Sequence, residues 1–277
     1  MGPVKGLEFV FLAGGAVAFA AGTVAAAGTI RTGSPRYLGW GRAAALLGTA
    51  LCTAALAASA GRGGPLPAGT TAQALALLSA AASAAALVLD LRKAMPILLA
   101  ATLPLALLSS LLALVLALAP VAPSPAPPGW GMALHVAVAL AAYAAFALAF
   151  SSGLVFLLVQ HQLKRRAAPP FLGLMPALET VRRVNVRAIA AGVILLGAGL
   201  VAGYLTAREL YPGQRQWRLD PKVFLTTVTV LAYATILVLS RRPSFKGRRT
   251  ALASVAGFAL VLATIGASIL GSGFHRF

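Results

Sequence analysis

The sequence predicts an all-α integral membrane protein, a polytopic bundle of about eight transmembrane helices with both termini outside. Of its 277 residues, 60% are hydrophobic and 10% are charged, and the mean hydropathy is +0.89. Soluble domains carry about 25% charged residues, so this composition excludes a soluble globule. A membrane span takes about 20 apolar residues, so eight spans leave only short connections and no room for a large domain outside the membrane.

Eight apolar stretches are each long enough to cross a bilayer. They lack the alternating polarity of membrane β-strands, which favours helices over a barrel. More basic residues follow the first stretch than precede it, so we interpret it as an uncleaved span with its N-terminus outside rather than as a signal peptide. In chain order the stretches are Leu7–Ile30, Leu38–Ala60, Thr71–Leu89, Met95–Leu118, Met132–Gln160, Ala188–Thr206, Val223–Leu239 and Ala251–Gly271.

The net charge of +18 would suggest a nucleic-acid partner in a soluble chain. Here the basic residues lie between the apolar stretches, where they fix topology and meet anionic lipid head groups, so we expect no nucleic acid as a partner. Sixteen of the 23 Lys and Arg residues lie in the odd-numbered connections, if Arg42 at the start of the second stretch is counted with the first connection. The positive-inside rule therefore places these connections in the cytoplasm and both termini outside.

The connection Val121–Gly129 carries no charge and is rich in Pro, Ala and Ser, which predicts an extended external linker. It divides the chain into an N-terminal four-helix membrane half (1–120), the linker (121–130) and a C-terminal half (131–277). The N-terminal half has few polar groups within its spans, and its residues indicate packing alone.

An amphipathic segment, Leu174–Arg187, precedes the sixth apolar stretch. Apolar residues recur in it at helical spacing, while Glu179, Arg182 and Arg183 occupy other faces. Two interpretations remain open: a short helix on the cytoplasmic membrane surface, or a cytoplasmic extension of the sixth helix.

The three histidines are the most informative polar residues. His135 lies just inside the outer end of the fifth stretch and His275 just past the outer end of the eighth, so both face the external compartment. Two imidazoles can ligate the iron of one porphyrin from opposite sides, whereas zinc usually needs three or four protein ligands. The pair indicates a haem site, with ordinary interfacial placement as the alternative. His161, beside Lys164, is typical of an interfacial residue.

The external connection before the seventh stretch combines aromatic and basic residues. Trp217 can stack on a porphyrin while cations such as Arg218 meet its propionates, although an interface-anchoring tryptophan in a basic loop is the alternative. This connection holds four of the seven outer basic residues, an excess that favours an anionic partner. Asp220 followed by Pro221 predicts the N-cap and first turn of the seventh helix.

Several kinds of chemistry are excluded by the residues. Cys52 is the only cysteine, so the chain can form neither an internal disulfide nor a Cys-x-x-Cys-His haem attachment site. No Ser/His/Asp order, phosphate-binding glycine loop or His-Glu-x-x-His sequence is present. The five acidic residues sit at or outside the ends of the stretches. The spans therefore contain almost no carboxylates from which a proton relay across the membrane could be built.

From about Trp130 onward, the order of motifs resembles the cytochrome c assembly family of haem-handling membrane proteins, the CcsA/CcmC type, and particularly its eight-span HemX/YpjD-like branch. The matching stretches are His135 with Ala141–Phe146, Arg187 with Gly192–Gly203, Leu219–Lys222, Gly247–Arg249, Gly257–Leu260 and Leu270–His275. The resemblance implies that residues 131–277 handle haem, that His135 and His275 are the metal ligands, and that Trp217 and Asp220 end a tryptophan-rich external segment.

The resemblance also implies a function. We expect a haem-binding protein of cytochrome c maturation that holds b-type, non-covalent haem at the outer face for delivery to apocytochrome c. It would act as a haem chaperone or a subunit of a haem lyase rather than as an independent catalyst. The implied partners are haem, apocytochrome c, an accessory membrane subunit and the lipid bilayer, in the cell inner (cytoplasmic) membrane with the functional face outside or periplasmic.

Two alternatives remain open. The family segment Trp-Gly-x-x-Trp-x-Trp-Asp-Pro-Lys-Glu is reduced here, with Leu219 at a tryptophan position and Val223 at the glutamate position. This reduction favours a HemX-like membrane regulator of haem biosynthesis, which acts on the level of the first pathway enzyme. The third interpretation is a small-molecule transporter, a class in which inverted repeats are frequent. Gly199 and Gly203, four residues apart, suit close helix packing.

Overall fold

The computed structural model describes residues 3–60, 70–118, 130–165, 171–210 and 220–269. Within them the chain forms long α-helices and two short 3-10 turns, without a strand, and eight helices are long and apolar enough to cross a membrane. The predicted all-α membrane bundle is therefore confirmed. The elements are α1 (Pro3–Thr32), α2 (Pro35–Ala60), α3 (Thr71–Lys93), α4 (Pro96–Ala117), α5 (Trp130–Arg165), η1 (Leu172–Leu174), α6 (Leu178–Leu210), α7 (Pro221–Leu239), η3 (Pro243–Phe245) and α8 (Arg248–Ile269).

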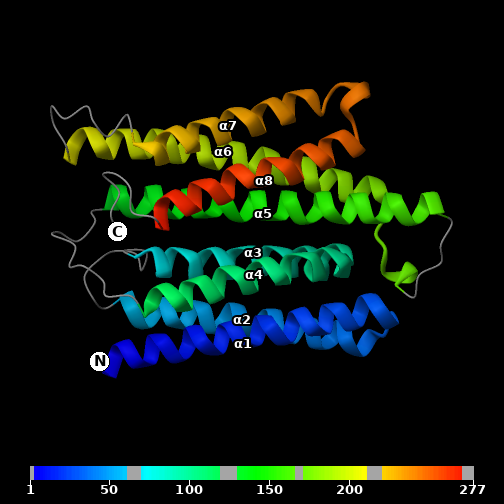
Figure 1. Cartoon of the computed structure of the whole chain (residues 1–277), viewed down its shortest axis with the longest axis horizontal. Helices are drawn as coiled ribbons and strands as arrows, with labels where there is room; N and C mark the ends of the chain where they lie inside the picture. Colours follow the sequence, from blue (N-terminus) through cyan, green and yellow to red (C-terminus); the bar gives the residue numbers. More distant parts are fainter. Residues whose placement is uncertain (1–2, 61–69, 119–129, 166–170, 211–219, 270–277) are drawn as a thin grey trace.

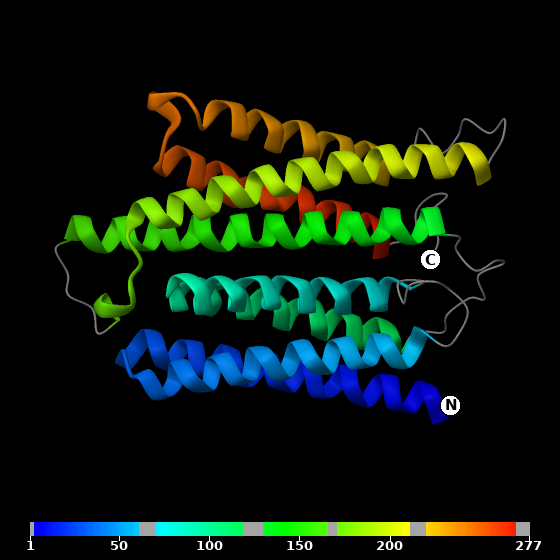
Figure 2. The ribbon, with the colours of Figure 1, turned by 180° about the vertical axis from the view of Figure 1, so that it is seen from behind.

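The helices lie side by side along the long axis of the molecule, in successive layers (Figures 1 and 2). Helices α1 and α2 form one side, α3 and α4 follow, α5 lies beside α8, and α6 and α7 form the other side. Helix α5 contacts both α3 and α4, so it joins the two halves of the chain. Helix α1 begins, and α8 ends, at the same end of the bundle.

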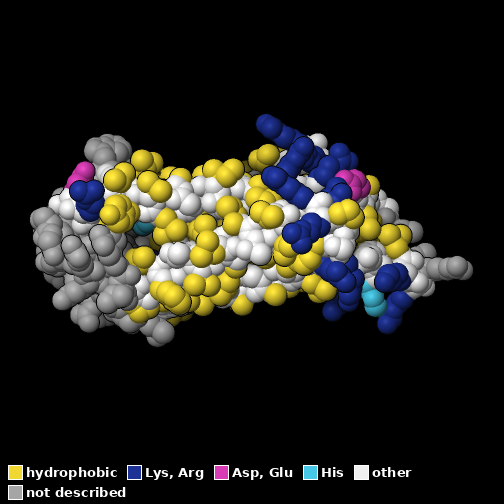
Figure 3. All heavy atoms as spheres, turned by 90° about the horizontal axis from the view of Figure 1, so that it is seen from above, with side chains coloured by type: hydrophobic (Ala, Val, Ile, Leu, Met, Phe, Trp, Pro, Cys, Tyr) yellow, Lys and Arg dark blue, Asp and Glu magenta, His cyan; other side chains and the backbone are white. Residues whose placement is uncertain are grey.

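The two ends of the bundle differ in charge. Figure 3 shows Lys and Arg side chains gathered at one end of the visible face, with apolar side chains along the middle. We call this the basic end, and the other the opposite end. Large exposed apolar residues such as Val17, Ile194 and Leu231 suit contact with lipid tails along the middle. The exposed residues of the basic end are Arg31, Arg36, Arg92, Lys93, Lys164, Arg165, Arg183, Arg187, Arg241, Arg242, Lys246, Arg248 and Arg249.

The amphipathic segment before the sixth stretch belongs to α6. This helix starts at Leu178 and continues without interruption to Leu210, so the predicted extension of the sixth helix is confirmed from Leu178 onward, and these residues do not form a separate helix. Its 33 residues make it about 50 Å long, well beyond a hydrocarbon core of about 30 Å. The first turn is stabilised by Arg182, whose Nε and Nη2 donate to the Glu179 carboxylate over 2.7 and 2.6 Å.

A half-buried ion pair joins α2 to α3 near the basic end. The Arg42 guanidinium donates to both carboxylate oxygens of Asp90, over 2.7 and 3.1 Å, and the Asp90 side chain is 0% exposed. A bidentate Arg–carboxylate pair is strong and directional. The N-terminal half therefore contains an ionic contact that sequence analysis missed, because the two residues were assigned to separate connections.

A second polar cluster ties together three helices of the C-terminal half. The Asn185 amide nitrogen on α6 donates to the Ala149 carbonyl and the Ser152 hydroxyl of α5, over 2.6 and 3.2 Å, and to the Ser254 hydroxyl of α8 over 3.0 Å. Such hydrogen bonds hold membrane helices together where burial in lipid supplies no driving force between them. These bonds thus join α5, α6 and α8 in the half of the bundle nearer the basic end.

Candidate functional site

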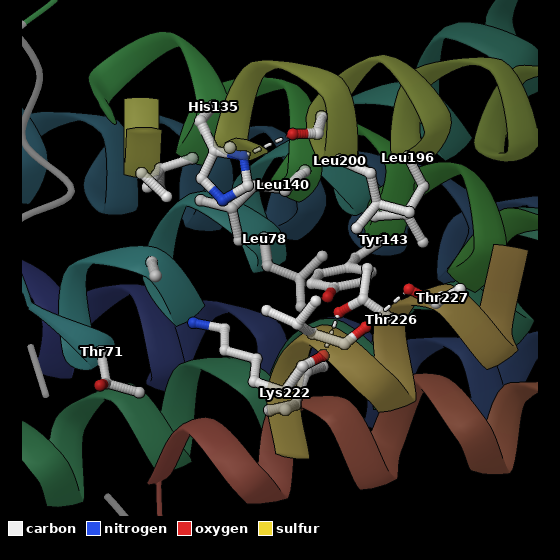
Figure 4. A pocket seen from close by; sticks show the side chains of 18 of the residues that line it. Thr71, Leu78, His135, Leu140, Tyr143, Leu196, Leu200, Lys222, Thr226 and Thr227 are labelled. Atoms are coloured by element: carbon white, nitrogen blue, oxygen red, sulfur yellow. Dashed lines mark hydrogen bonds between the residues drawn. The ribbon is translucent and has the colours of Figure 1, made fainter. Parts of the chain in front are cut away.

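A cavity of ≈ 330 Å³ opens at the opposite end of the bundle, between helices of both halves. This volume lies within the range of about 300–1,000 Å³ that is usual for small-molecule sites. Most of its wall is apolar, and a few polar groups converge on it (Figure 4). Five helices supply the lining residues that matter below: Thr71 and Leu78 from α3, His135 and Tyr143 from α5, Gly199 and Gly203 from α6, Lys222 and Val223 from α7, and Ile265 from α8.

His135, in the second turn of α5, projects into this cavity. Its Nδ1 atom lies 2.7 Å from the carbonyl oxygen of Gly199 on α6. Because a carbonyl only accepts hydrogen bonds, this contact requires a proton on Nδ1, and in the neutral ring the lone pair is then on Nε2. Metal-ligating histidines are commonly oriented by such a bond from the other ring nitrogen. A neutral His135 ring in this tautomer has the arrangement of a metal-ligating histidine.

Gly203 makes the space for this imidazole. A Cβ atom at position 203 would lie 2.7 Å from Cε1 and 2.8 Å from Nδ1 of His135, distances that real Cβ atoms essentially never show. One helical turn earlier, Gly199 faces the backbone of α5 at Ala139, but a Cβ atom there would lie 3.7–3.8 Å from Ala139, which is an ordinary contact distance. Of the two glycines, Gly203 is the one whose lack of a side chain the packing requires.

The first turn of α7 forms the facing part of the wall. Asp220 is 4% exposed, and its carboxylate accepts a 2.8 Å hydrogen bond from the Lys222 backbone N–H, while Pro221 occupies the first helical position. The predicted N-cap is thus confirmed. The cap fixes the turn from which the Lys222 side chain enters the cavity (Figure 4).

The N-terminal half contributes the remaining wall through the start of α3. The Thr70 side chain caps this helix by accepting a hydrogen bond from the Gln73 N–H over 3.2 Å. Thr71 and Leu78 then face the cavity opposite α5 and α6. Sequence analysis assigned this half to packing alone. The sequence signal at this position is a Thr-Thr pair before an apolar stretch. Such a pair predicts where the helix starts, but it does not predict which part of the protein the helix contacts.

The predicted site residues are distributed as follows. His135 lines the cavity, and Asp220 anchors the turn beside it. His275, Trp217 and Arg218 lie outside the described residues. His161, near the end of α5 at the basic end, is exposed.

The site combines three chemical features within its described lining. An imidazole, a lysine side chain and mainly apolar walls lie together there. This combination suits a mainly apolar ligand with a few polar groups.

A protein-family model matches this chain over most of its length. The family model described as "Cytochrome C assembly protein" matches residues 68–275, so the likeness begins at the start of α3 and precedes the predicted linker. It covers every helix that lines the cavity.

Curated relatives named "Cytochrome c biogenesis protein CcsA" match shorter regions. The protein of Prochlorococcus marinus (strain NATL1A) is 31% identical over 100 residues, which are 36% of this chain and 31% of that protein. Those of Porphyra purpurea and Synechococcus elongatus are 33% and 32% identical over 104 and 132 residues, covering 37% and 47% of this chain and 32% and 39% of the relatives. The chain thus spans roughly a third of the length of the curated relatives it matches. By the extent of the family match, this chain belongs to the cytochrome c assembly protein family.

Proposed function

We propose that this protein takes part in cytochrome c biogenesis by holding haem in the cavity at the opposite end, with His135 as an iron ligand. The observation that carries the proposal is the bond between His135 Nδ1 and the Gly199 carbonyl, which leaves the lone pair on Nε2. The relatives are named as cytochrome c biogenesis proteins, and attaching haem to a cytochrome requires a protein that binds and orients it.

The described residues fit haem as a cargo. Apolar side chains from α3, α5 and α6 suit the porphyrin face, Tyr143 adds an aromatic wall, and the imidazole suits the iron. Bound haem is non-covalent in this proposal, because Cys52 is buried in the core, away from the described cavity lining. The reactive thiols belong to the apocytochrome, and this chain binds and orients the haem.

A second ligand and a stacking residue are proposed from the sequence. His275 follows the end of α8 in the sequence, and α8 ends at the end of the bundle where α5, which carries His135, begins (Figure 1), which supports a bis-histidine site. Trp217 and Arg218 precede Asp220, whose cap begins the cavity wall. We assign Trp217 to stacking on the porphyrin and Arg218 to its propionates. Asp220 acts as a positioning residue.

The basic end supports an orientation. Since short cytoplasmic connections carry the excess of Lys and Arg, the basic end faces the cytoplasm and the cavity faces the outer or periplasmic compartment of the inner membrane. Apocytochrome c and an accessory membrane subunit would meet the protein at this outer face.

The test is the optical spectrum and haem content of the detergent-purified protein and of His135→Ala, His275→Ala and the double variant. We expect a low-spin haem spectrum that is weakened in each single variant and lost in the double variant. His161→Ala, at the basic end, is the matched control and keeps the wild-type spectrum. Haem that is absent after reconstitution, or unchanged in the double variant, would contradict the ligand assignment.

One observation favours a second function. Leu219 and Val223 replace the tryptophan and glutamate of the family segment, and Val223 lines the cavity, so the surface that would meet an apocytochrome is altered. A regulator of haem biosynthesis needs haem binding but no such surface. Deletion of the protein separates the two functions: loss of c-type cytochromes supports maturation, whereas normal cytochromes with altered levels of the first pathway enzyme support regulation.

A further inference from the structure

The cavity reaches the side of the bundle between α6 and α7. Among its described lining residues, two are exposed at the protein surface, Tyr204 of α6 and Thr227 of α7. Tyr204 is 42% exposed, and the two helices that carry these residues contact each other. We call the surface between Tyr204 and Thr227 the lateral opening, because both residues belong to the sides of helices rather than to a loop.

The lateral opening lies at the depth of lipid tails. Helix α7 has 19 residues and is therefore about 28 Å long, close to the thickness of a hydrocarbon core of about 30 Å. Its first residue, Pro221, thus lies near one edge of the core, and Thr227 lies six residues further along the helix, about 9 Å deeper. Figure 4 shows Thr227 farther along α7 than Lys222. In the proposed orientation, this depth belongs to the outer leaflet.

The residues beside the lateral opening face lipid. Thr227 shares one stripe of α7 with Phe224 and Leu231, at a spacing of one and two helical turns, and these two neighbours are 65% and 62% exposed. On α6, Val201 is 61% exposed. The Thr227 hydroxyl donates to the Val223 carbonyl over 2.8 Å, so its hydrogen bond is made within α7 and the side chain suits an apolar environment. The cavity therefore opens onto a lipid-facing surface.

On the inside, the lateral opening leads to the candidate iron ligand. Tyr204 directly follows Gly203, whose lack of a side chain makes room for the imidazole of His135. Beyond this point the wall continues with the buried residues Leu196 and Tyr143. A flat ligand that passes between α6 and α7 therefore reaches the imidazole without crossing the remaining helices of the cavity wall.

The apolar faces of a porphyrin favour a path through lipid. Exposing apolar surface to water costs about 25 cal/mol per Å², and a porphyrin that approaches the cavity from solution exposes both of its faces. A porphyrin that moves from lipid tails through the lateral opening into a mainly apolar cavity keeps them out of water throughout. The membrane path therefore avoids the unfavourable step of the aqueous path.

We propose that the lateral opening between Tyr204 and Thr227 is the route by which porphyrin passes between the outer leaflet and the cavity. The inference rests on the proposed function and deepens it, because it assigns the source of the cargo to haem dissolved in the membrane rather than to haem in the external solution. It predicts that the space between α6 and α7 controls the rates of loading and release.

The experiment places a removable benzyl group in the lateral opening. Thr227→Cys is modified with benzyl methanethiosulfonate, and dithiothreitol removes the benzyl group again, so each sample is its own control for folding. The matched control is Phe224→Cys, on the same lipid-facing stripe of α7 but outside the described cavity lining. Wild-type protein treated with the reagent checks that the buried Cys52 does not react.

The probe is metal-free protoporphyrin IX, so that binding does not depend on iron ligation. With the full chain in phosphatidylcholine vesicles, porphyrin fluorescence reports loading, and mixing with an excess of empty vesicles reports release. We expect the benzyl group at position 227 to slow loading and release alike, each by about tenfold, which is about 1.4 kcal/mol in the barrier. Dithiothreitol should restore both rates, and modified Phe224→Cys should match the wild type.

Two kinetic results would overturn the route. Unchanged rates in modified Thr227→Cys would show that porphyrin enters and leaves elsewhere. Slower loading together with faster release would show that the benzyl group occupies the binding site instead of the path to it, because a narrowed path slows both directions equally.

A nitroxide attached to Thr227→Cys tests whether the lateral opening meets lipid or water. Oxygen concentrates among lipid tails, whereas a charged nickel chelate stays in water. We expect the nitroxide to collide mainly with oxygen, as it should at Phe224→Cys. Collisions mainly with the nickel chelate would contradict a path through the membrane.

Failure of the route can be distinguished from failure of the proposed function. If the porphyrin rates depend on the benzyl group while the haem spectrum is unaffected by His135→Ala, the route stands and the iron ligand is wrong. If the haem spectrum depends on His135 while the benzyl group leaves the rates unchanged, the ligand stands and the route is wrong. If neither haem nor protoporphyrin IX binds the wild-type protein, both are wrong.

Discussion

The Gly199 carbonyl oxygen and Nδ1 of His135 lie 2.7 Å apart, and this contact couples the orientation of the imidazole to the backbone of α6. Since the acceptor is a main-chain group, a side-chain substitution does not remove it. The acceptor keeps its place only while α6 stays at this distance from α5. The geometry of the candidate metal donor therefore depends on how closely these two helices pack.

Gly203→Ala should weaken haem binding. The added methyl would lie 2.7 Å from Cε1 of His135, so the imidazole must shift, and overpacking of this kind costs about 1–3 kcal/mol. We expect haem affinity to fall by about tenfold, measured by optical titration. Gly197→Ala is the matched control on α6, because a Cβ there meets nothing within 4 Å. Equal affinities of the two variants would show that Gly203 does not seat the ring.

Asp220→Ala should destabilise the protein through the start of α7. Loss of an N-cap costs about 0.5–2 kcal/mol, and the Asp220 carboxylate bonds the Lys222 N–H. We expect a lower thermal unfolding temperature for Asp220→Ala. Asp220→Asn retains a capping oxygen and should stay close to the wild type. If Asp220→Asn is as unstable as Asp220→Ala, the negative charge of Asp220 matters more than the cap.

Leu78→Trp should reduce haem content from within the N-terminal half. Leu78 of α3 lines the cavity, so the larger indole occupies space that the porphyrin needs. The same substitution at Leu91, which is 64% exposed on the same helix, controls for the added ring and should leave haem content unchanged. Normal haem content in a folded Leu78→Trp protein would contradict a role of α3 in the site.

Arg42→Met should destabilise the fold without changing the haem spectrum. It leaves the Asp90 carboxylate buried and without its bidentate partner, at a cost of about 1–3 kcal/mol. Because the remaining charge causes the loss, the double variant Arg42→Met/Asp90→Leu should recover part of the stability. Arg36→Met, an exposed residue of the same basic end, is the control. Additive losses in a double-mutant cycle would show that the two residues act independently.

The elements of this fold were largely predictable. Long apolar stretches identify spans regardless of what they pack against, and Asp220 with Pro221 is a local signal for a helix start. The extension of α6 through Glu179 and Arg182 followed from helical spacing, although the pattern did not decide between two interpretations.

The arrangement of the helices was less predictable, for a physical reason. A span that meets lipid or protein on all sides is apolar all round, so no polar face shows which helices are neighbours. The contact of Arg42 with Asp90, the seat that Gly203 makes for His135 and the cavity wall at Thr71 all depend on such neighbours. Each involves residues far apart in the sequence, and each needed the three-dimensional structure.

Because α3 forms part of the cavity wall, ligand binding is coupled to the packing of the two halves of the chain against each other. Its described lining comes from helices on both sides of the predicted linker, so neither half alone encloses the ligand. A ligand that binds only the docked form stabilises docking in proportion to its occupancy. Bound haem would then stabilise the contact between the two halves. A newly inserted chain would bind haem only after its two halves have packed together.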